Sequence, residues 1–128
     1  MKSSAVKNEL IRAEIKKYRI DIIGFPETNI KWSKVPHEDQ IWERTYHWFK
    51  KQKADVAYNT HDDNAESYQR GGCSQIAINE SAHRISTSGS DPSQLGRWVW
   101  QIFKGKNKHM TRVVTLYRPV YNLSLIHI

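Results

Sequence analysis

The sequence lacks the features of secreted and membrane-spanning proteins. It has a single cysteine, Cys73, which excludes an internal disulfide. Its apolar runs fall far short of the about 20 residues that a helix needs to cross a bilayer. The opening residues, MKSSAVKNELIRAEIKKYR, contain no apolar signal core. We therefore expect an intracellular protein, nuclear or cytoplasmic, that is neither exported nor associated with a membrane.

Acidic residues are scarce relative to basic ones. Lysine and arginine number 20 against 13 aspartates and glutamates, which gives a net charge of +7 over 128 residues. A chain of this length accommodates one domain. The positive charge favours an acidic partner such as nucleic acid, although charge bears on association and not on fold. The oligomeric state is left open.

Hydrophobic periodicity predicts an α/β class. Residues 4–18 form an amphipathic pattern whose apolar side holds Val6, Leu10, Ile11, Ile15 and Tyr18. The chain then runs into a strand over residues 20–25, and its near-continuous apolar character suits a central strand covered on both faces. A second helix is predicted over residues 37–52, HEDQIWERTYHWFKKQ, because apolar residues recur there at helical spacing.

The second half of the chain reads as strands and turns. Residues 54–70 are rich in turn formers, which predicts a long surface loop. A glycine pair then leads into an alternating strand at residues 71–80, and a turn-rich connector follows at residues 83–96. Residues 97–105 and 111–119 are expected to pair as a hairpin across a lysine-bearing turn.

Four of these segments resemble the motifs of one superfamily, in the same order. They are DIIGFPETNIKW, RGGCSQIAINE, LGRWVW and VVTLYRPV. Together they look like the endonuclease/exonuclease/phosphatase superfamily, and most like the endonuclease domains of retrotransposons that encode a reverse transcriptase. The resemblance covers roughly residues 8–121. It implies a partial four-layer α/β/β/α sandwich over residues 1–122, incomplete at both ends, and Mg²⁺-dependent cleavage of phosphodiester bonds in DNA.

The resemblance also implies roles for individual residues. Glu27 matches the family's metal-binding glutamate, and a carboxylate suits Mg²⁺, which keeps waters and phosphate oxygens as its other ligands. Tyr117 matches the active-site tyrosine at a strand end. Asn29 and Arg118 are candidate nucleic-acid contacts. Pro26 departs from the glutamine usual before the glutamate, and Asn29 stands where many relatives have lysine.

Several family motifs have no counterpart in this sequence. The first strand with its early asparagine, the later GDxN motif, and the terminal aspartate paired with the general-base histidine are not found. A general base typically contributes about 10²–10⁴-fold to the rate. We therefore expect little or no turnover from this chain, whereas its full-length parent would nick target DNA to prime reverse transcription.

The last residues suggest a separate origin. LSLIHI, residues 123–128, is the translation of CTGTCTCTTATACACATC, which looks like the end sequence of transposase-based sequencing libraries. The hypothesis is that coding sequence gives way to adapter after about Asn122, so His127 is assigned no role.

Each candidate residue has a simpler interpretation when taken alone. Glu27 would then be a solvated loop charge, and Tyr117 a half-buried strand aromatic. Trp98 and Trp100 share one strand face by alternation, and we predict that they lie in the core rather than stack on bases. Cys73 is expected to be a small buried residue.

Two charged clusters are also open to more than one interpretation. His61, Asp62 and Asp63 could imitate a metal site, but adjacent side chains on a loop seldom converge, so a solvated loop is favoured. The lysines at 104, 106 and 108 are either a solvated hairpin tip or phosphate contacts. For the whole chain, the alternatives to a nuclease fragment are a non-catalytic basic nucleic-acid-binding module and a phosphatase-type member of the same superfamily.

Overall fold

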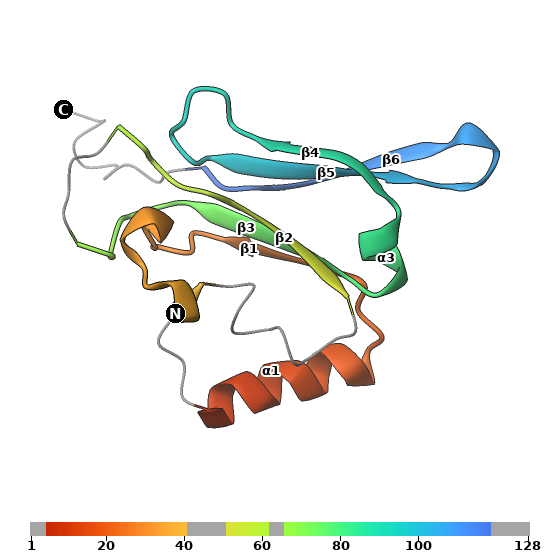
Figure 1. Cartoon of the computed structure of the whole chain (residues 1–128), viewed down its shortest axis with the longest axis horizontal. Helices are drawn as coiled ribbons and strands as arrows, with labels where there is room; N and C mark the ends of the chain where they lie inside the picture. The colour runs from red at the N-terminus through yellow and green to blue at the C-terminus, as the bar shows by residue number, and fades with distance from the viewer. Residues whose placement is uncertain (1–4, 41–50, 62–65, 119–128) are drawn as a thin grey trace, which may run out of the picture.

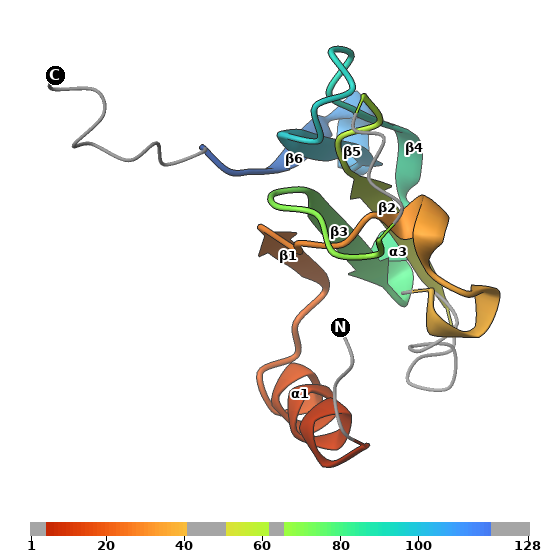
Figure 2. The ribbon, with the colours of Figure 1, turned by 90° about the vertical axis from the view of Figure 1, so that its left-hand side faces the viewer.

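Two antiparallel sheets stack face to face, and one helix covers the outer side of the first sheet (Figures 1 and 2). The computed structural model describes residues 5–40, 51–61 and 66–118. The elements in chain order are α1 (Ala5–Lys17), β1 (Ile22–Pro26), η1 (Trp32–Lys34), η2 (His37–Asp39), β2 (Gln52–Ala57), β3 (Cys73–Ile78), α3 (Glu80–His83), β4 (Ile85–Ser90), β5 (Trp98–Lys104), η3 (Lys106–Lys108) and β6 (Met110–Leu116).

The first sheet has the order β1-β3-β2, with β3 antiparallel to both neighbours. Every residue of β3 is buried. Because side chains alternate along a strand, β3 contributes side chains to two hydrophobic cores, one on each face of its sheet. Ile76 and Ile78 pack in the cluster that contains Ile15 of α1, whereas Cys73 packs with Val99 of the second sheet. The mixed α/β class expected from the sequence is therefore confirmed.

The strand predicted at residues 20–25 is confirmed as β1, but its predicted central position is wrong. β1 lies at the edge of its sheet within the described residues, and β3 is the central strand. The side chains of β1 are half-buried or exposed. Ile23 and Phe25 pack against the core beneath α1, whereas Gly24 faces Thr115 of β6.

The predicted N-terminal helix is confirmed as α1, but only part of its apolar stripe is buried. Ile15 is 5% exposed and Ile11 packs against the same core. Leu10 and Tyr18 are each 63% exposed, so the sheet does not reach them. The side chain of Val6 lies outside the described part of the chain.

The second sheet has the order β4-β5-β6 and contains the predicted hairpin. β5 and β6 pair in register from Trp98↔Leu116 to Lys104↔Met110, and the hairpin extends past the first sheet (Figure 1). The prediction that Trp98 and Trp100 lie in the core is wrong. Val99, between them, is fully buried against the first sheet, so the two tryptophans point to the outer face.

Three elements differ from the sequence-based expectations. Residues 54–57, predicted as loop, belong to β2, and residues 85–90, predicted as connector, form β4. Both strands are rich in small or polar side chains, so their sequences lack the alternation of apolar and polar residues that predicts a strand. In the predicted second helix, His37–Asp39 is a 3₁₀ turn and Gln52 starts β2, while residues 41–50 lie outside the described residues.

The space between the sheets is filled largely by a polar network. Gln75 and Gln101 are both fully buried, and Gln75 Nε2 donates to Gln101 Oε1 at 2.8 Å. Gln101 Nε2 donates to Asp55 Oδ2 at 2.8 Å, and Ser88 Oγ donates to Asp55 Oδ1 at 3.1 Å. Thr115 Oγ1 donates to Gln75 Oε1 at 2.8 Å. Hydrogen bonds therefore fix how the two sheets stack.

Cys73 is buried as predicted, and its environment suppresses its reactivity. It is 0% exposed, and burial, together with the charge of Asp91, raises the pKa of its thiol to about 11. Since the thiolate is the nucleophile, we expect Cys73 to resist Ellman's reagent near pH 8 in the folded protein and to react at once in denaturant. Rapid labelling of the native protein would contradict its placement between the sheets.

No helix in the described ranges is long and apolar enough to span a bilayer. The proposed adapter-derived residues 123–128, with Asn122 before them, lie outside the described residues.

Candidate functional site

Glu27 follows the last residue of β1 at one end of the first sheet. It is exposed and has a positive φ of 53°, which turns the chain sharply away from the strand. The ladder between β1 and β3 ends beside it, at Pro26↔Cys73. Glu27 is therefore presented at the rim of the sheet and not within the core.

The segment after Glu27 is held against the glycine pair that precedes β3. Thr28 N donates to Gly72 O at 3.1 Å, and Asn29 N donates to Gly71 O at 2.8 Å. The side chain of Asn29 contributes as well, since its Oδ1 accepts a hydrogen bond from Gly71 N at 3.0 Å. These bonds fix the backbone on which Glu27 is mounted.

Tyr117 reaches the same end of the molecule from the second sheet. It follows β6, and its backbone N donates to Arg97 O at 3.1 Å. Its ring packs against Ala57, Cys73 and Val99, and its hydroxyl lies directly over Gly71, where a Cβ would overlap it. The structure thus brings Tyr117, Gly71 and Asn29 together from three separate segments.

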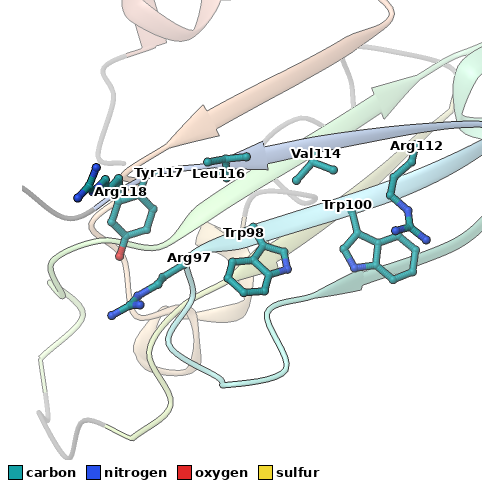
Figure 3. A pocket seen from close by; sticks show the side chains of 8 residues that line it. All are labelled: Arg97, Trp98, Trp100, Arg112, Val114, Leu116, Tyr117 and Arg118. Atoms are coloured by element: carbon teal, nitrogen blue, oxygen red, sulfur yellow. The ribbon is translucent and has the colours of Figure 1, made fainter.

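Arg118 lies next to Tyr117 on the outer side of the second sheet. Both residues line one end of an open groove of about 470 Å³, together with Arg97 (Figure 3). Arg118 is exposed, and no carboxylate lines the groove. Of the four residues singled out in the sequence, Asn29 and Tyr117 meet at Gly71, Glu27 lies two residues before Asn29, and Arg118 faces the groove.

Glu27 supplies a carboxylate at this rim that is suited to a Mg²⁺ ion. Glu27 offers an exposed carboxylate, and the buried hydroxyl oxygen of the adjacent Thr28 has no hydrogen-bond partner among the described residues. No three His, Cys, Asp or Glu side chains gather into a metal-binding group in the described part of the chain. Mg²⁺ is commonly bound by one or two carboxylates, with water and phosphate oxygens as its other ligands. The His61, Asp62 and Asp63 cluster is described only at His61, whose Nε2 contacts Ser93 O at 2.9 Å.

Asp91 was not singled out in the sequence, although it organises the turn next to this end of the second sheet. It is 3% exposed, and its carboxylate accepts hydrogen bonds from Ser93 N at 2.8 Å and Arg97 N at 3.3 Å. Burial raises the pKa of the Asp91 carboxyl, but the hydrogen bonds from Ser93 and Arg97 and the charge of Arg97 lower it by more. The net effect is a pKa below its ordinary value of 3.8. The motif DPS, an aspartate followed two residues later by serine, is typical of such a turn.

The lowered pKa of Asp91 predicts acid sensitivity. A carboxyl whose pKa is lower in the folded state stabilises the protein above its unfolded-state value and loses that contribution as pH falls through the folded value. We expect Asp91→Asn to cost about 1–3 kcal/mol near neutral pH. The difference in unfolding free energy between the two proteins should shrink between about pH 5 and pH 2 in urea titrations. A difference that stays constant with pH would contradict the charged, hydrogen-bonded Asp91.

Gly71 should tolerate no side chain while Tyr117 lies over it. Its φ of 89° is unfavourable for other residues, and the Tyr117 hydroxyl occupies the Cβ position. We expect Gly71→Ala to destabilise the fold by about 1–3 kcal/mol from the backbone alone, with a further cost from displacing Tyr117. Tyr117→Ala should therefore cost less in the Gly71→Ala background than in the wild type, as a double-mutant cycle measured by chemical denaturation would show. If the free-energy costs of the two substitutions simply added, the Tyr117 side chain would not lie over Gly71.

No family model matches the sequence, and no curated protein matches it. The superfamily resemblance therefore depends on the four sequence motifs alone.

Proposed function

We propose that this chain is part of a Mg²⁺-dependent endonuclease domain of a retroelement, whose full-length parent nicks DNA. One observation carries the proposal: Tyr117 lies over the backbone to which the segment after Glu27 is hydrogen-bonded. The two residues come from different sheets and lie 90 positions apart in the sequence. An exposed carboxylate and a tyrosine hydroxyl at one rim are suited to a phosphodiester group and its cation.

Each residue takes a role that its surroundings allow. Glu27 would hold Mg²⁺, which when bound polarises a phosphoryl oxygen and stabilises the leaving oxyanion. The Tyr117 hydroxyl would donate to a phosphate oxygen. Asn29 already accepts from Gly71 through Oδ1, which leaves its amide nitrogen to donate to the DNA backbone. Arg118, exposed and beside Tyr117, would contact a neighbouring phosphate.

For the architecture, we propose a partial four-layer α/β/β/α sandwich. The helix α1 and the two stacked sheets account for three layers. In the parent, a second helical layer would pack on the outer face of β4-β5-β6, which no helix covers in the described ranges (Figure 2).

A basic nucleic-acid-binding module without catalysis is the second candidate, favoured by the net charge of +7. A salt titration of duplex DNA binding tests it, because binding through phosphates weakens steeply as salt rises. Absence of salt-dependent affinity would remove this candidate. A phosphatase-type member of the superfamily remains the third, since Glu27 and Tyr117 would contact metal and phosphate in either enzyme.

Supercoiled-plasmid nicking in Mg²⁺ tests the activity of this chain. The comparison is between wild type, Glu27→Ala and Glu80→Ala, since Glu80 is an exposed glutamate beyond the opposite end of β3. Because the sequence has no match to the family's general base, we expect no nicking above the Glu27→Ala background. Nicking that disappears only in Glu27→Ala would show that the residues present suffice for turnover, and would overturn the expected inactivity.

A further inference from the structure

The outer face of the second sheet combines exposed aromatic and aliphatic side chains. Trp98 is 36% exposed, Val114 41% and Leu116 61%, and Trp100 is half-buried. All four project from the same side of the β5–β6 hairpin and line the groove described above (Figure 3). We call these residues, with Arg97, Arg112 and Arg118, the hairpin face.

The hairpin face is positively charged, and of its three arginines Arg97 is partly offset by the nearby charge of Asp91. Its three arginines have no ion pair among the described residues, and no aspartate or glutamate lines the groove. The sequence from residue 92 onward contains six lysines and arginines and no acid at all. The face and the lysine-bearing tip at Lys104, Lys106 and Lys108 therefore present charge of one sign along the whole hairpin.

We propose that the hairpin face binds single-stranded DNA. Exposed aromatic rings on a basic groove are the features by which proteins bind unpaired strands, with bases stacked on the rings and phosphates paired with cations. A duplex keeps its bases stacked on one another and offers none to Trp98. The polar groups of the groove are the three arginines, the Tyr117 hydroxyl and the two indole N–H groups, which suit phosphates and base edges. No carboxylate or amide side chain lines it to accept from the 2′-hydroxyl of RNA, so we expect a preference for DNA.

The two tryptophans have different parts in this face. The ring of Trp100 already has contacts within the protein. It lies over Gly89, and the Arg112 guanidinium lies 4.9 Å from its centroid. This contact holds Arg112 above the sheet, where its N–H groups can meet a phosphate. Trp98 carries the free ring and stacks on a base. Trp98 and Trp100 are two apart on β5 and hence separated by roughly 7 Å. Because the Arg112 guanidinium lies over Trp100, the base on Trp98 and the phosphate on Arg112 belong to neighbouring nucleotides.

This inference goes beyond the proposed nuclease, because binding requires neither Glu27 nor Mg²⁺. It concerns the hairpin face as the described residues leave it, with no helix packed on it. A helical layer supplied by a longer parent would compete with DNA for the same surface.

Fluorescence anisotropy with a labelled oligo-dT of roughly ten nucleotides, in EDTA, tests the inference. We expect Trp98→Leu to weaken binding roughly 5- to 100-fold, as loss of one stacked base does, and Trp98→Phe to keep most of the affinity. Arg112→Gln should reduce the slope of log K against log salt by roughly 0.7, the value for one phosphate on a single strand. The same assays with oligo-U and with duplex DNA should give weaker binding.

The chain offers a matched control on its far side. Lys17 lies 5.2 Å from the ring centroid of Tyr18, which is 63% exposed beyond α1. Tyr18→Leu and Lys17→Gln remove an even more exposed ring and its cation, and we expect both to bind oligo-dT as the wild type does. Thermal melting would confirm that every variant is folded.

Three results would overturn the proposal. Trp98→Leu could bind oligo-dT as tightly as Trp98→Phe, which would show that base stacking on Trp98 does not contribute to binding. Tyr18→Leu could weaken binding as much as Trp98→Leu, which would place DNA elsewhere. Finally, gel filtration could show a dimer that Trp98→Leu dissociates while oligo-dT binding is unchanged, which would assign the face to a second copy of the chain.

Discussion

Replacing Gly96 with alanine is expected to destabilise the fold by about 2–5 kcal/mol, a large part of the stability of a small domain. Gly96 has a φ of 73°, and a Cβ there would lie 2.5–2.8 Å from the backbone Cα, C and N atoms of Tyr58. Backbone atoms cannot move aside as a flexible side chain can. The turn that contains Asp91 would therefore separate from the end of β2.

Gly105→Ala is the matched control for this prediction. Gly105 has a negative φ of −105°, and its nearest neighbour would be 3.4 Å from an added Cβ. We expect its unfolding free energy, measured in urea, to lie within about 0.5 kcal/mol of the wild type. Equal stabilities for Gly96→Ala and Gly105→Ala would contradict the close packing of the turn on Tyr58.

Gln101→Leu is expected to cost on the order of 3 kcal/mol, although the two side chains are similar in size. The change removes the 2.8 Å donor of Asp55 Oδ2 and the 2.8 Å acceptor of Gln75 Nε2, which keeps only its longer bond to Val113 O at 3.2 Å. A buried polar group without a partner carries its full desolvation cost. Gln94→Leu removes only an exposed hydrogen bond, the one that Gln94 Oε1 accepts from Thr60 Oγ1 at 2.9 Å, and should cost much less because water can replace it.

The glutamine pair should also be strongly non-additive. Once Gln101 is leucine, Gln75→Leu removes a group that has already lost one partner, so the second substitution should cost less than it does alone. Urea denaturation of the two single variants and the double variant measures this coupling. Independent effects of the two substitutions would mean that Gln75 and Gln101 do not bond to each other in solution.

The elements that could be predicted from the sequence are those whose side chains follow a clear period. α1, β1, β3 and the β5–β6 hairpin have apolar residues at helical or strand spacing. β4 could not be predicted, because its Ser and Thr side chains face a partner sheet through hydrogen bonds such as Ser88 to Asp55. Gln75 and Gln101 could not be recognised as buried for the same reason: their partners are supplied by tertiary structure.

The candidate site was only partly predictable. Glu27 and Tyr117 were selected by resemblance to family motifs, and they lie at the same end of the molecule. The reason for the glycine pair could not be predicted, because the overlap of Gly71 with Tyr117 depends on how the sheets stack. The exposure of Trp98 was predicted wrongly, since alternation places residues on a common face but does not say which face is covered.

The central proposal is that Glu27 binds a metal ion, and paramagnetic broadening by Mn²⁺ in a ¹⁵N NMR spectrum tests it most directly. Mn²⁺ takes the same oxygen ligands as Mg²⁺. We expect selective broadening of the amide signals of Thr28, Asn29, Gly71 and Gly72 in the wild type and in Glu80→Gln, and none of these changes in Glu27→Gln. Equal broadening in the wild type and Glu27→Gln, or broadening centred on Glu80, would contradict the proposal.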